Sequence, residues 1–492
     1  MKFKSLVTMA LSSHYDALII GSGQGGTPLA SAFAKAGRKT ALVESKHIGG
    51  CCVNEGCTPT KTLIASGRNA YMTRRGADFG VHTLDGKDGE IRQDMLKVRQ
   101  RKRDIVNKFR SGGESRTHAA GVEVLMGLAA FVDKKTMRVK LNDGEEKTIT
   151  ADKIFINTGE RPAQPRLENL ESVTPERVLD STSIQELGEV PEHLLILGGG
   201  YIGLEFGQLF RRFGAQVTIV QRAAQLLPRE DPDVADCMLK ILQEDGITVH
   251  LSTSAIRVDT SSSGDVELTI RPKEGNEQRL SGSHLLSAAG RTPNTDTLNL
   301  GAAGVSTLNS GHIAVNSRLE TSTPDIYALG DVKGPPAFTH ISYDDFRVLQ
   351  HNLLTSSSPS GDTSSHVEPL TTDNRMVPYV VYTDPQLGHV GLHEHEARTQ
   401  FPQKTIKVAK MPMKYVARAL ECDETRGMMK AVVDGETGEI LGFTCLGLEG
   451  GEIMAVVQMT MMGKLPWQKL QDAVWAHPSL AESLNNIWGF LE

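Results

Sequence analysis

The sequence predicts an α/β protein that contains two Rossmann-like dinucleotide-binding domains followed by a C-terminal α+β domain. A short apolar segment runs into a glycine-rich turn twice, at residues 15–26 and again at 194–203. After each turn, a helical pattern and a second apolar segment complete a βαβ unit, the building block of a parallel sheet. The chain beyond residue 376 instead reads as several strands and one helix. These three observations define the predicted fold class.

Length and composition are those of an ordinary globular protein with several domains. The 492 residues exceed what one hydrophobic core organises, and 39% hydrophobic with 23% charged residues is a typical balance. A net charge of -6 gives no general attraction to nucleic acid or to anionic membranes. No apolar run has the length of a membrane-spanning helix. The sequence therefore predicts neither nucleic-acid nor membrane partners.

The cysteine content and the first residues bear on location. Six cysteines are too few for a disulfide framework in so long a chain, which predicts a reducing, cytoplasmic compartment. Residues 1–14 contain Lys2 and Lys4 and no acidic residue, a marginal match to a mitochondrial address. We interpret residues 1–14 as a flexible N-terminal extension, with a mitochondrial location as the alternative.

Residues 15–44 form the first predicted dinucleotide unit. A strand at 15–20 ends in the glycines Gly21, Gly23 and Gly26, a helix follows at about 27–36, and a strand at 40–43 ends at Glu44. The glycines let the backbone approach a pyrophosphate, the helix N-terminus faces its charge, and Glu44 can accept from ribose hydroxyls. The unit is predicted to bind a dinucleotide, and a simple tight turn is the alternative.

A cysteine pair follows directly after this unit. Cys52 and Cys57 lie five positions apart, with Gly56 between them and Pro59 after them. Five helical residues rise about 7.5 Å, more than the roughly 7 Å between Cα atoms that a disulfide spans. A bridge therefore needs a distorted turn, which Gly56 allows, and a strained, accessible disulfide is easily reduced. The pair is predicted to move electrons, and two ordinary buried thiols are the alternative.

The middle of the chain leads to the first domain boundary. Residues 62–116 read as helices, residues 122–140 as a strand pair with a turn at 133–135, and residues 153–157 as a strand. This strand runs into Thr158 and Gly159, and the prolines that follow indicate a crossing between domains.

A second unit repeats the first. A strand at 194–197, a helix at 201–213 and a strand at 216–220 surround the glycines Gly198, Gly200 and Gly203. Where an NAD site would place a carboxylate, the chain has Gln221 followed by Arg222. A guanidinium in place of an acid suits a 2′-phosphate, so the pattern favours NADPH over NADH. The alternative for Arg222 is a solvated surface charge.

The segments after the second unit return to strands. Residues 265–286 are strand-rich and end in a glycine-proline crossing at Gly290, and a strand at 326–329 leads to Asp331. A carboxylate at a strand end can hold the ribityl hydroxyls of a flavin, and a plain helix cap is the alternative. A polar loop at 355–365 marks the next boundary.

The last domain reads as an antiparallel sheet and a helix. Strands are predicted at 377–382, 405–410, 428–433 and 440–446, with a helix at 452–462. Near the end, Pro478 keeps His477 out of helix and is expected to start a helix behind it, with Glu482 in reach of the imidazole. A carboxylate raises the basicity of a histidine that exchanges protons with a thiol.

Two dinucleotide units around a cysteine pair predict a relay from a nicotinamide through a flavin to a disulfide. The predicted division is an extension at 1–14, an FAD-binding part at 15–165, an NAD(P)H-binding domain at 166–290, a segment completing the FAD domain at 291–366, and a last domain at 367–492.

These residues together resemble the FAD-dependent pyridine nucleotide-disulfide oxidoreductases, the family of dihydrolipoamide dehydrogenase, glutathione reductase and mercuric reductase. The resemblance covers residues 15–492 and follows the family's order of motifs. These are the first glycine set, Cys-Val-Asn-Glu-Gly-Cys, Thr-Gly-Glu-Arg-Pro, the second glycine set with Glu205, Ala-Leu-Gly-Asp, and His-Pro-Ser-Leu-Ala-Glu.

The resemblance implies a role for each matched residue. Cys57 would contact the flavin and Cys52 would exchange with the substrate. Lys61 would pair with Glu205 beside the flavin, and Tyr201 would cover the nicotinamide pocket. The resemblance also assigns Asp331 to the ribityl chain, and His477 with Glu482 to acid-base chemistry at the other subunit's cysteines. The last domain would then hold a homodimer together.

The acceptor stays open at this point. Residues 221–232 and 416–420 look most like mercuric reductases, but residues 485–492 contain no cysteine pair that could capture a metal ion. The predicted acceptor is therefore a small-molecule disulfide. No metal is predicted to bind the protein. The alternatives are an NAD-linked dihydrolipoamide dehydrogenase, a mercuric-ion or quinone reductase, and a flavin-binding partner without catalysis. Cys51 stands where the family usually has threonine, and we interpret it as a packing residue rather than an exchanging thiol.

Overall fold

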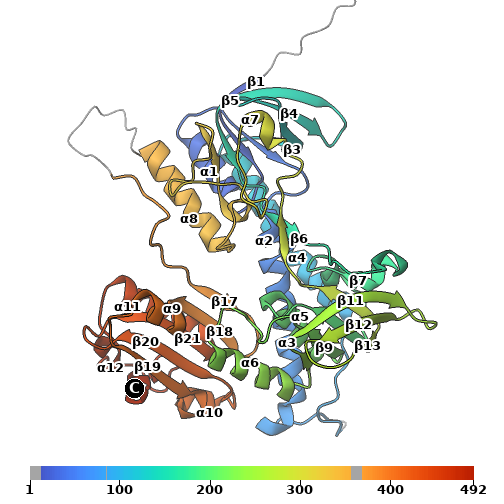
Figure 1. Cartoon of the computed structure of the whole chain (residues 1–492), viewed down its shortest axis with the longest axis vertical. Coiled ribbons are helices and arrows are strands. Elements are labelled where there is room, and N and C mark those ends of the chain that lie inside the picture. Colours follow the sequence, from blue (N-terminus) through green and yellow to red (C-terminus); the bar gives the residue numbers. More distant parts are fainter. Residues whose placement is uncertain (1–12, 85, 356–367) are drawn as a thin grey trace, which may run out of the picture. The chain divides into compact units, whose positions relative to one another are not determined.

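The computed structural model describes residues 13–84, 86–355 and 368–492, which form two compact units (Figure 1). The first unit comprises the chain up to Thr60, Lys102–Arg161 and Arg291–Arg375, and the second comprises Lys61–Arg101, Pro162–Gly290 and Met376–Glu492. Most of the predicted N-terminal extension and of the polar loop at 355–365 lies outside the described residues. Among the described helices, none is long and apolar enough to cross a membrane.

The first unit is built on a parallel sheet in the order β3-β2-β1-β5-β16, with β4 joining the ends of β3 and β5 antiparallel. The strands are β1 (Ser13–Ile20), β2 (Thr40–Glu44), β3 (Glu123–Phe131), β4 (Thr136–Leu141), β5 (Glu146–Ile156) and β16 (Ile326–Ala328). The helices are α1 (Gly26–Lys35), α2 (Gly50–Asn54), α7 (Leu300–Ala303) and α8 (Thr339–Gln350), together with most of α4 (Met95–Ala119).

Both faces of this sheet are buried, as expected of parallel strands. On one face, Ile19 and Phe155 pack with Leu29 and Phe33 of α1 and Leu349 of α8. The opposite face packs against residues around α7. The glycine turn after β1 is therefore held between two fixed elements, β1 and α1.

The second unit combines three sheets. Its parallel sheet has the order β10-β9-β8-β14-β7. The strands are β7 (Val178–Leu179), β8 (His193–Leu197), β9 (Gln216–Val220), β10 (Thr248–His250) and β14 (His284–Ser287), beside an antiparallel sheet of β11 (Thr253–Thr260), β12 (Val266–Pro272) and β13 (Gln278–Gly282). The helices are α3 (Cys57–Arg74, from Lys61 on), α5 (Tyr201–Phe213) and α6 (Pro232–Glu244).

The third sheet of this unit is antiparallel, in the order β17-β18-β21-β20-β19. Its strands are β17 (Tyr379–Val381), β18 (Gln386–Gly391), β19 (Ile406–Pro412), β20 (Met428–Asp434) and β21 (Ile440–Gly447). The helices are α9 (Glu394–Gln400), α10 (Ala417–Glu421), α11 (Gly450–Met462), α12 (Gln468–Gln471) and α13 (Ser483–Asn486). Two short strands elsewhere, β6 (Glu160–Pro162) and β15 (Arg291–Pro293), pair with each other.

The predicted α/β class with a C-terminal α+β domain is confirmed, whereas one strand was missed and one local prediction is wrong. The strand β18 was not predicted, because its glycines at 388 and 391 weaken the apolar alternation. The helix expected directly behind Pro478 begins only at Ser483, since Glu482 and Ser483 first make turn contacts to Ser479 and Leu480. The finer division into domains remains a prediction.

Candidate active site

The first glycine turn is a tight cradle at the N-terminus of α1. A Cβ atom added to Gly26 would lie 2.2 Å from the carbonyl oxygen of Gly21, and one added to Gly23 would lie 2.8 Å from the Asn157 side-chain nitrogen. Side chains at these positions would therefore force the turn open. The cradle leaves backbone N–H groups at the start of a ten-residue helix, which is an arrangement that fits a pyrophosphate.

Glu44 lies at the end of β2, next to this turn. Its Oε2 accepts hydrogen bonds from the Ser22 backbone N–H at 3.1 Å and from Ser22 Oγ at 2.6 Å. Its Oε1 accepts from the Lys46 N–H at 2.8 Å. These bonds fix the carboxylate beside the turn, and its remaining lone pairs can accept from a ribose. The residues of the first unit thus fit the FAD that the resemblance implies.

The second unit repeats this arrangement with an amide in place of the acid. A Cβ atom on Gly203 would lie 2.1 Å from the carbonyl oxygen of Gly198. Gln221 Oε1 accepts from the Gly199 N–H at 3.1 Å, and its Nε2 donates to the Gln225 carbonyl at 3.0 Å. Gln221 therefore occupies the same place beside the turn as Glu44 does, while the next residue, Arg222, is exposed. This second cradle fits a second dinucleotide.

The two cysteines lie on either side of a break between helices. Cys52 is in α2, which ends at Asn54, and Cys57 is the first residue of α3. Gly56 lies at the break, where an added Cβ would come within 3.2 Å of the Cys51 Sγ and 3.1 Å of the Cys51 carbonyl oxygen. The distorted turn that the spacing predicted is present, and Pro59 lies in the first turn of α3.

Cys52 and Cys57 are free thiols here, and they are close enough to share a hydrogen bond. The hydrogen bond with Cys57, together with burial, raises the pKa of Cys52 far above its ordinary value. Cys57 Sγ also lies 3.3 Å from the Thr339 hydroxyl. The two sulfurs are thus unequal, because Cys52 holds its proton while Cys57 is exposed.

Cys51 has different neighbours. Its Sγ accepts from the Arg291 guanidinium at 3.7 Å, and Arg291 donates to the Glu160 carbonyl at 2.8 Å and pairs with the Glu160 carboxylate at 3.2 Å. Burial raises the pKa of the Cys51 thiol, and Arg291 opposes this shift. This environment is that of a partly buried, protonated thiol.

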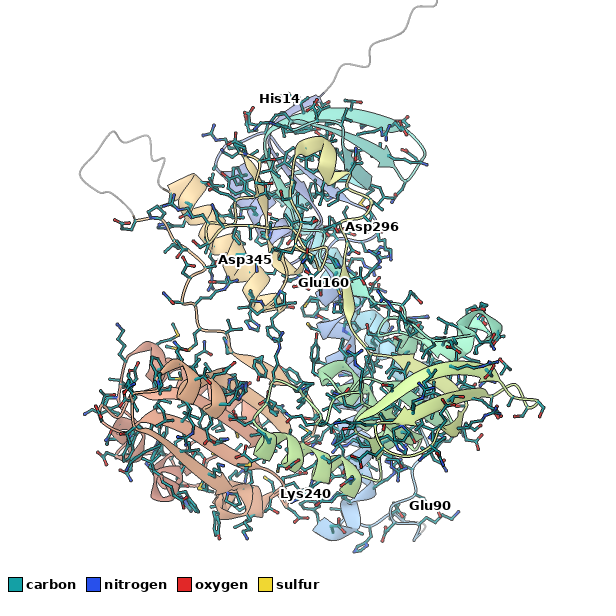
Figure 2. All side chains as sticks on the ribbon, in the orientation of Figure 1. His14, Glu90, Glu160, Lys240, Asp296 and Asp345 are labelled. Carbon is teal, nitrogen blue, oxygen red and sulfur yellow. The ribbon has the colours of Figure 1, made fainter. Side chains whose placement is uncertain are left out.

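Asp331 belongs to the same polar cluster, although sequence reasoning did not bring its neighbours together. Burial and the nearby Glu160 raise the pKa of Asp331 to about 6, while Arg291 and Lys333 lower it. His312 Nε2 lies 2.7 Å from the other carboxylate oxygen of Glu160, which Figure 2 labels. Glu160 and Arg291 each lie in a motif noted in the sequence, but nothing in the sequence indicated His312 or Thr339.

Lys61 and the buried Glu205 form a partly buried ion pair in the second unit. Lys61 Nζ donates to Glu205 Oε2 at 2.7 Å, and Glu205 is 3% exposed. The other oxygen, Oε1, accepts from the Tyr382 N–H at 2.8 Å, and the Lys61 ammonium lies 4.9 Å from the centre of the Tyr382 ring. The pairing that the resemblance implied is therefore present in the structure, and Tyr382 is an added partner.

The remaining predicted residues also have defined places. His477 Nδ1 lies 3.0 Å from both carboxylate oxygens of Glu482, so the expected contact is present. The exposed Tyr201 begins α5 directly after Gly200. Thr158 and Asn294 exchange two hydrogen bonds of 2.8 Å, and Gly159 and Gly290 lie in turns with φ values of 66° and 135°.

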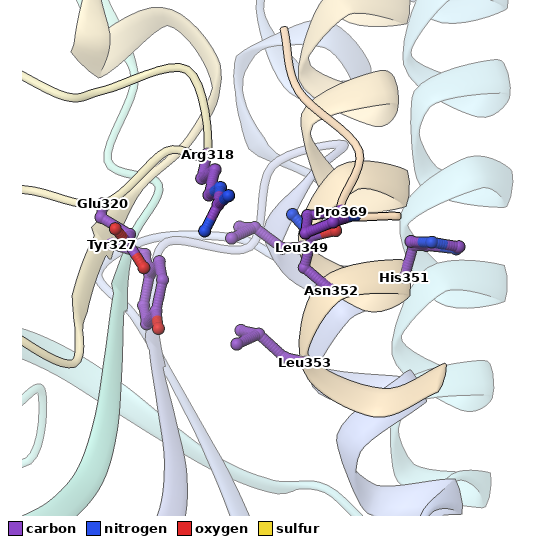
Figure 3. Close-up of a pocket in the computed structure, with 8 residues that line it drawn as sticks. All are labelled: Arg318, Glu320, Tyr327, Leu349, His351, Asn352, Leu353 and Pro369. Atoms are coloured by element: carbon purple, nitrogen blue, oxygen red, sulfur yellow. The ribbon is translucent and has the colours of Figure 1, made fainter. Parts of the chain in front are cut away.

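A surface pocket in the first unit contains none of the predicted site residues (Figure 3). Its lining is mixed polar and apolar and comes from the loop before β16, β16 itself and the end of α8. The residues are Arg318, Glu320, Tyr327, Leu349, His351, Asn352, Leu353 and Pro369.

Comparison with known proteins places these features in a family. The model of the pyridine nucleotide-disulphide oxidoreductases matches residues 15–345, and the model of the dimerisation domain of that family matches residues 377–487. The chain is 35% identical to the probable pyridine nucleotide-disulfide oxidoreductase RclA of Escherichia coli, over 97% of this chain and 99% of the relative.

Two further kinds of relative, and one solved structure, agree with this match. A mercuric reductase of Lysinibacillus sphaericus is 31% identical over 98% of this chain and 83% of its own length. A dihydrolipoyl dehydrogenase of Geobacillus stearothermophilus is 31% identical over 95% and 94%. The solved HOCl-induced flavoprotein disulfide reductase RclA of Escherichia coli, in its Cu(II) complex, superposes with a TM-score of 0.84 at 35% identity, over 97% of this chain and 99% of that chain.

Proposed function

This chain belongs to the pyridine nucleotide-disulphide oxidoreductase family, and we propose that it passes electrons from NADPH through FAD to a Cys52–Cys57 disulfide and on to a disulfide acceptor. Membership makes it an FAD-dependent flavoprotein oxidoreductase that uses NAD(P)H, and its dimerisation domain implies a homodimer. When bound, the flavin takes up two electrons from the nicotinamide and makes them available to a disulfide.

The observation that carries this proposal is the placement of the two thiols. Cys52 and Cys57 meet across the break between α2 and α3, in the same unit as the cradle formed by Gly21, Gly23 and Gly26. Two electrons and two protons convert the Cys52–Cys57 disulfide into this dithiol. The dithiol then reduces an acceptor disulfide to two thiols and returns to its own disulfide, which completes the balance.

The acid-base chemistry follows from the unequal thiols. Because the hydrogen bond with Cys57 and burial hold the proton on Cys52, Cys52 needs a base before it can attack an acceptor. We assign that role to the His477 imidazole, whose Nδ1 is oriented by Glu482 at 3.0 Å. Its Nε2 would then take the Cys52 proton and later return it to the leaving thiol, in a site completed by the second subunit.

The test is a substitution of the exchanging thiol. Cys52→Ser should abolish turnover with disulfide acceptors and retain the reduction of artificial dyes that take electrons directly from the flavin. Anaerobic titration with NADPH should produce a long-wavelength charge-transfer band in the native protein. Unchanged turnover with the physiological acceptor in Cys52→Ser would point to a reductase that works from the flavin alone.

The nucleotide preference is a separate part of the proposal. Gln221 stands where an NAD site has a carboxylate, so no negative charge at that position repels a 2′-phosphate. The exposed Arg222 next to it supplies a guanidinium that can bind the phosphate. Arg222→Ala should raise the KM for NADPH about tenfold and leave the KM for NADH unchanged. Arg229→Ala, an exposed arginine of the same loop, is the matched control. A native preference for NADH would contradict this assignment.

The acceptor class is supported by a relative and by the acid-base pair. The solved RclA of Escherichia coli is a flavoprotein disulfide reductase, and the His477–Glu482 pair supplies the proton chemistry that a disulfide acceptor needs. Six cysteines are too few for a disulfide framework in a chain of this length, which supports a reducing, cytoplasmic compartment. A screen of oxidised small-molecule thiols and quinones with purified protein would identify the acceptor.

A further inference from the structure

The second unit contains a buried cluster of metal-ligating side chains that the proposed redox chemistry does not use. Glu230, His389 and His393 each offer a ligand atom, and in the described part of the chain these atoms all lie within 4.8 Å of one another. The three residues are only 4%, 2% and 6% exposed. We propose that they bind one divalent first-row transition ion, of which Zn²⁺ is the representative.

Three segments of the chain bring these residues together. Glu230 lies just before α6, in the loop that leaves β9. His389 is in β18, opposite Thr444 of β21, and His393 is the N-cap residue of α9. An ion at this point would join the loop after the second dinucleotide unit to the antiparallel sheet, and all three segments belong to one compact unit.

Two buried polar atoms in the cluster face each other without a hydrogen bond. Neither Glu230 Oε2 nor His393 Nδ1 has a hydrogen-bond partner among the described residues, and the two atoms are 3.9 Å apart. The capping box at the start of α9 also brings the Glu396 backbone N–H close to the His393 side chain, although no hydrogen bond to Nδ1 is formed. A separation of 3.9 Å is too long for a hydrogen bond, whereas two metal–ligand bonds of about 2.0–2.1 Å would span it.

The other polar atoms of these side chains are already engaged. The Tyr379 hydroxyl donates to Glu230 Oε1 and lies 3.3 Å from His393 Nε2. His389 Nδ1 lies 2.8 Å from the Thr444 hydroxyl. Such contacts to the outer atoms of metal ligands fix their orientation. Glu230 Oε2 and His393 Nδ1 remain without a hydrogen bond, and His389 Nε2, which lies 3.1 Å from the Gly391 carbonyl oxygen, is the third candidate ligand atom.

Binding requires one local adjustment. His389 Nε2 lies 3.1 Å from the Gly391 carbonyl oxygen, and the His389 and His393 rings stack at 3.9 Å with 14° between their planes. The His389 ring must therefore tilt for its lone pair to converge with that of His393. The Gly391 carbonyl or a water could then occupy the fourth position of a tetrahedral site.

The charge around the cluster favours a cation. The buried Lys430 is already matched by Asp231 at 3.0 Å, Asp233 at 3.0 Å and Glu394 at 2.9 Å. Its charge is therefore shared among three carboxylates and is not reserved for Glu230. Two imidazoles and one carboxylate are also the donor set that borderline ions such as Zn²⁺ accept.

Metal analysis of the full-length, tag-free holoprotein tests the proposal. The native chain, incubated with Zn²⁺ and dialysed, should retain one equivalent, and crystals should show an anomalous peak at the zinc edge among the three side chains. Glu230→Gln, which preserves volume, and His389→Ala should each weaken Zn²⁺ binding at least about tenfold. His395→Gln is the matched control, because His395 is 58% exposed and bonds Asp231 outside the trio.

Because cysteine thiolates are zinc ligands, Cys52 and Cys57 could themselves take up the ion, so the same measurements are made in a Cys52→Ser/Cys57→Ser background. The proposed site is supported if the background protein retains one equivalent of Zn²⁺ and loses it when Glu230→Gln is added. The proposal is overturned if the background protein retains no zinc, or if Glu230→Gln and His389→Ala retain as much as the native chain. A crystal structure with a water molecule between Glu230 Oε2 and His393 Nδ1, and with the anomalous peak at another place, would also overturn it.

Discussion

At the scale of single residues, the three thiols near the break between α2 and α3 differ through their surroundings. Cys52 shares a hydrogen bond with Cys57, and Cys57 also contacts the Thr339 hydroxyl. Cys51 instead packs at Gly56 and accepts from Arg291. The difference assigns exchange chemistry to the first pair and packing to the third thiol, although all three lie within one short stretch of sequence.

Cys51→Thr should therefore change little. A threonine has a similar volume, and its hydroxyl can accept from Arg291 as the Cys51 sulfur does at 3.7 Å. Turnover with a disulfide acceptor should stay within about twofold of native, because a substitution that keeps volume and hydrogen bonding perturbs little. Steady-state kinetics check this, with Cys52→Ser as the inactive reference. A tenfold or larger loss would mean that Cys51 takes part in thiol exchange.

Asp331 should lower the stability of the FAD-free protein and at the same time help to hold the cofactor. Burial and Glu160 raise its pKa to about 6, against about 4 in an unfolded chain. Below pH 4 Asp331 is protonated in both the folded and the unfolded chain, so its raised pKa does not change the free energy of unfolding. Between pH 4 and pH 6 the free energy of unfolding falls, because the unfolded chain ionises and the folded chain does not. The loss is complete above pH 6, where both are ionised.

Asp331→Asn should consequently stabilise the FAD-free protein at pH 7 by roughly 1–2 kcal/mol, and by nothing at pH 4. The same change should weaken FAD retention about tenfold, if the carboxylate holds the ribityl hydroxyls. Thermal unfolding at several pH values and flavin release measure the two effects. Asp296→Asn, at an exposed carboxylate paired with Arg161, is the control and should show neither (Figure 2). Equal stabilisation at pH 4 would contradict the assignment.

At the scale of elements, the glycine cradle and α2 touch through their backbones. Gly50, the first residue of α2, has a φ of 63°, and a Cβ added there would lie 2.5 Å from the Gly23 Cα. The helix that carries Cys52 is thus positioned directly against the turn that is predicted to hold the flavin pyrophosphate. We therefore expect a bound flavin dinucleotide to lie close to Cys52.

Gly50→Ala should separate these two elements. The added methyl group must displace the Gly23 backbone, so we expect loss of bound flavin and a large loss of turnover. Gly37→Ala is the matched control. Gly37 also has a positive φ, 77°, but no atom lies within 4 Å of its added Cβ. Gly37→Ala should cost only about 1 kcal/mol of backbone strain and keep the flavin. Flavin content and unfolding temperature of both variants decide the matter, and equal behaviour would refute the crowding argument.

Elements with a strong local pattern could be predicted from the sequence, and those that depend on distant partners could not. The bounds of α5 and β9 match their predicted ranges, because apolar spacing and flanking glycines define them locally. The strand β18 and the turn behind Pro478 were missed, since sheet pairing with β21 and side-chain contacts from Ser479 determine them.

At the scale of the whole molecule, the same distinction applies to sites. Glycines, Glu44 and the cysteine pair lie close together in sequence, so spacing alone predicted their neighbourhood. The contacts of Lys61 with Glu205, and of Glu230 with His393, join segments far apart in the chain. The first was implied only by family resemblance. The second was missed: His389 and His393 are four positions apart, a spacing that metal ligands can have, but Glu230 lies far from them in sequence.

The single chain leaves apolar side chains uncovered in the domain that implies a homodimer. Met459, Met462, Leu465 and Val474 are exposed, and all four lie within the matched dimerisation domain. Val474 is only three positions from His477, whose ring is 69% exposed. Exposed apolar side chains in the domain that also carries the His477–Glu482 pair are the composition expected of an interface that completes a site.

Complementation between subunits tests that arrangement. Cys52→Ser and His477→Ala homodimers should each lack disulfide turnover. If each site takes Cys52 from one chain and His477 from the other, a mixed dimer contains one complete site and one site that lacks both residues. Random reassembly of equal amounts should then restore about a quarter of the native sites, because half of the dimers are mixed. If both residues of a site came from one chain, every site in the mixture would lack one of them, and turnover would stay at the level of the parents.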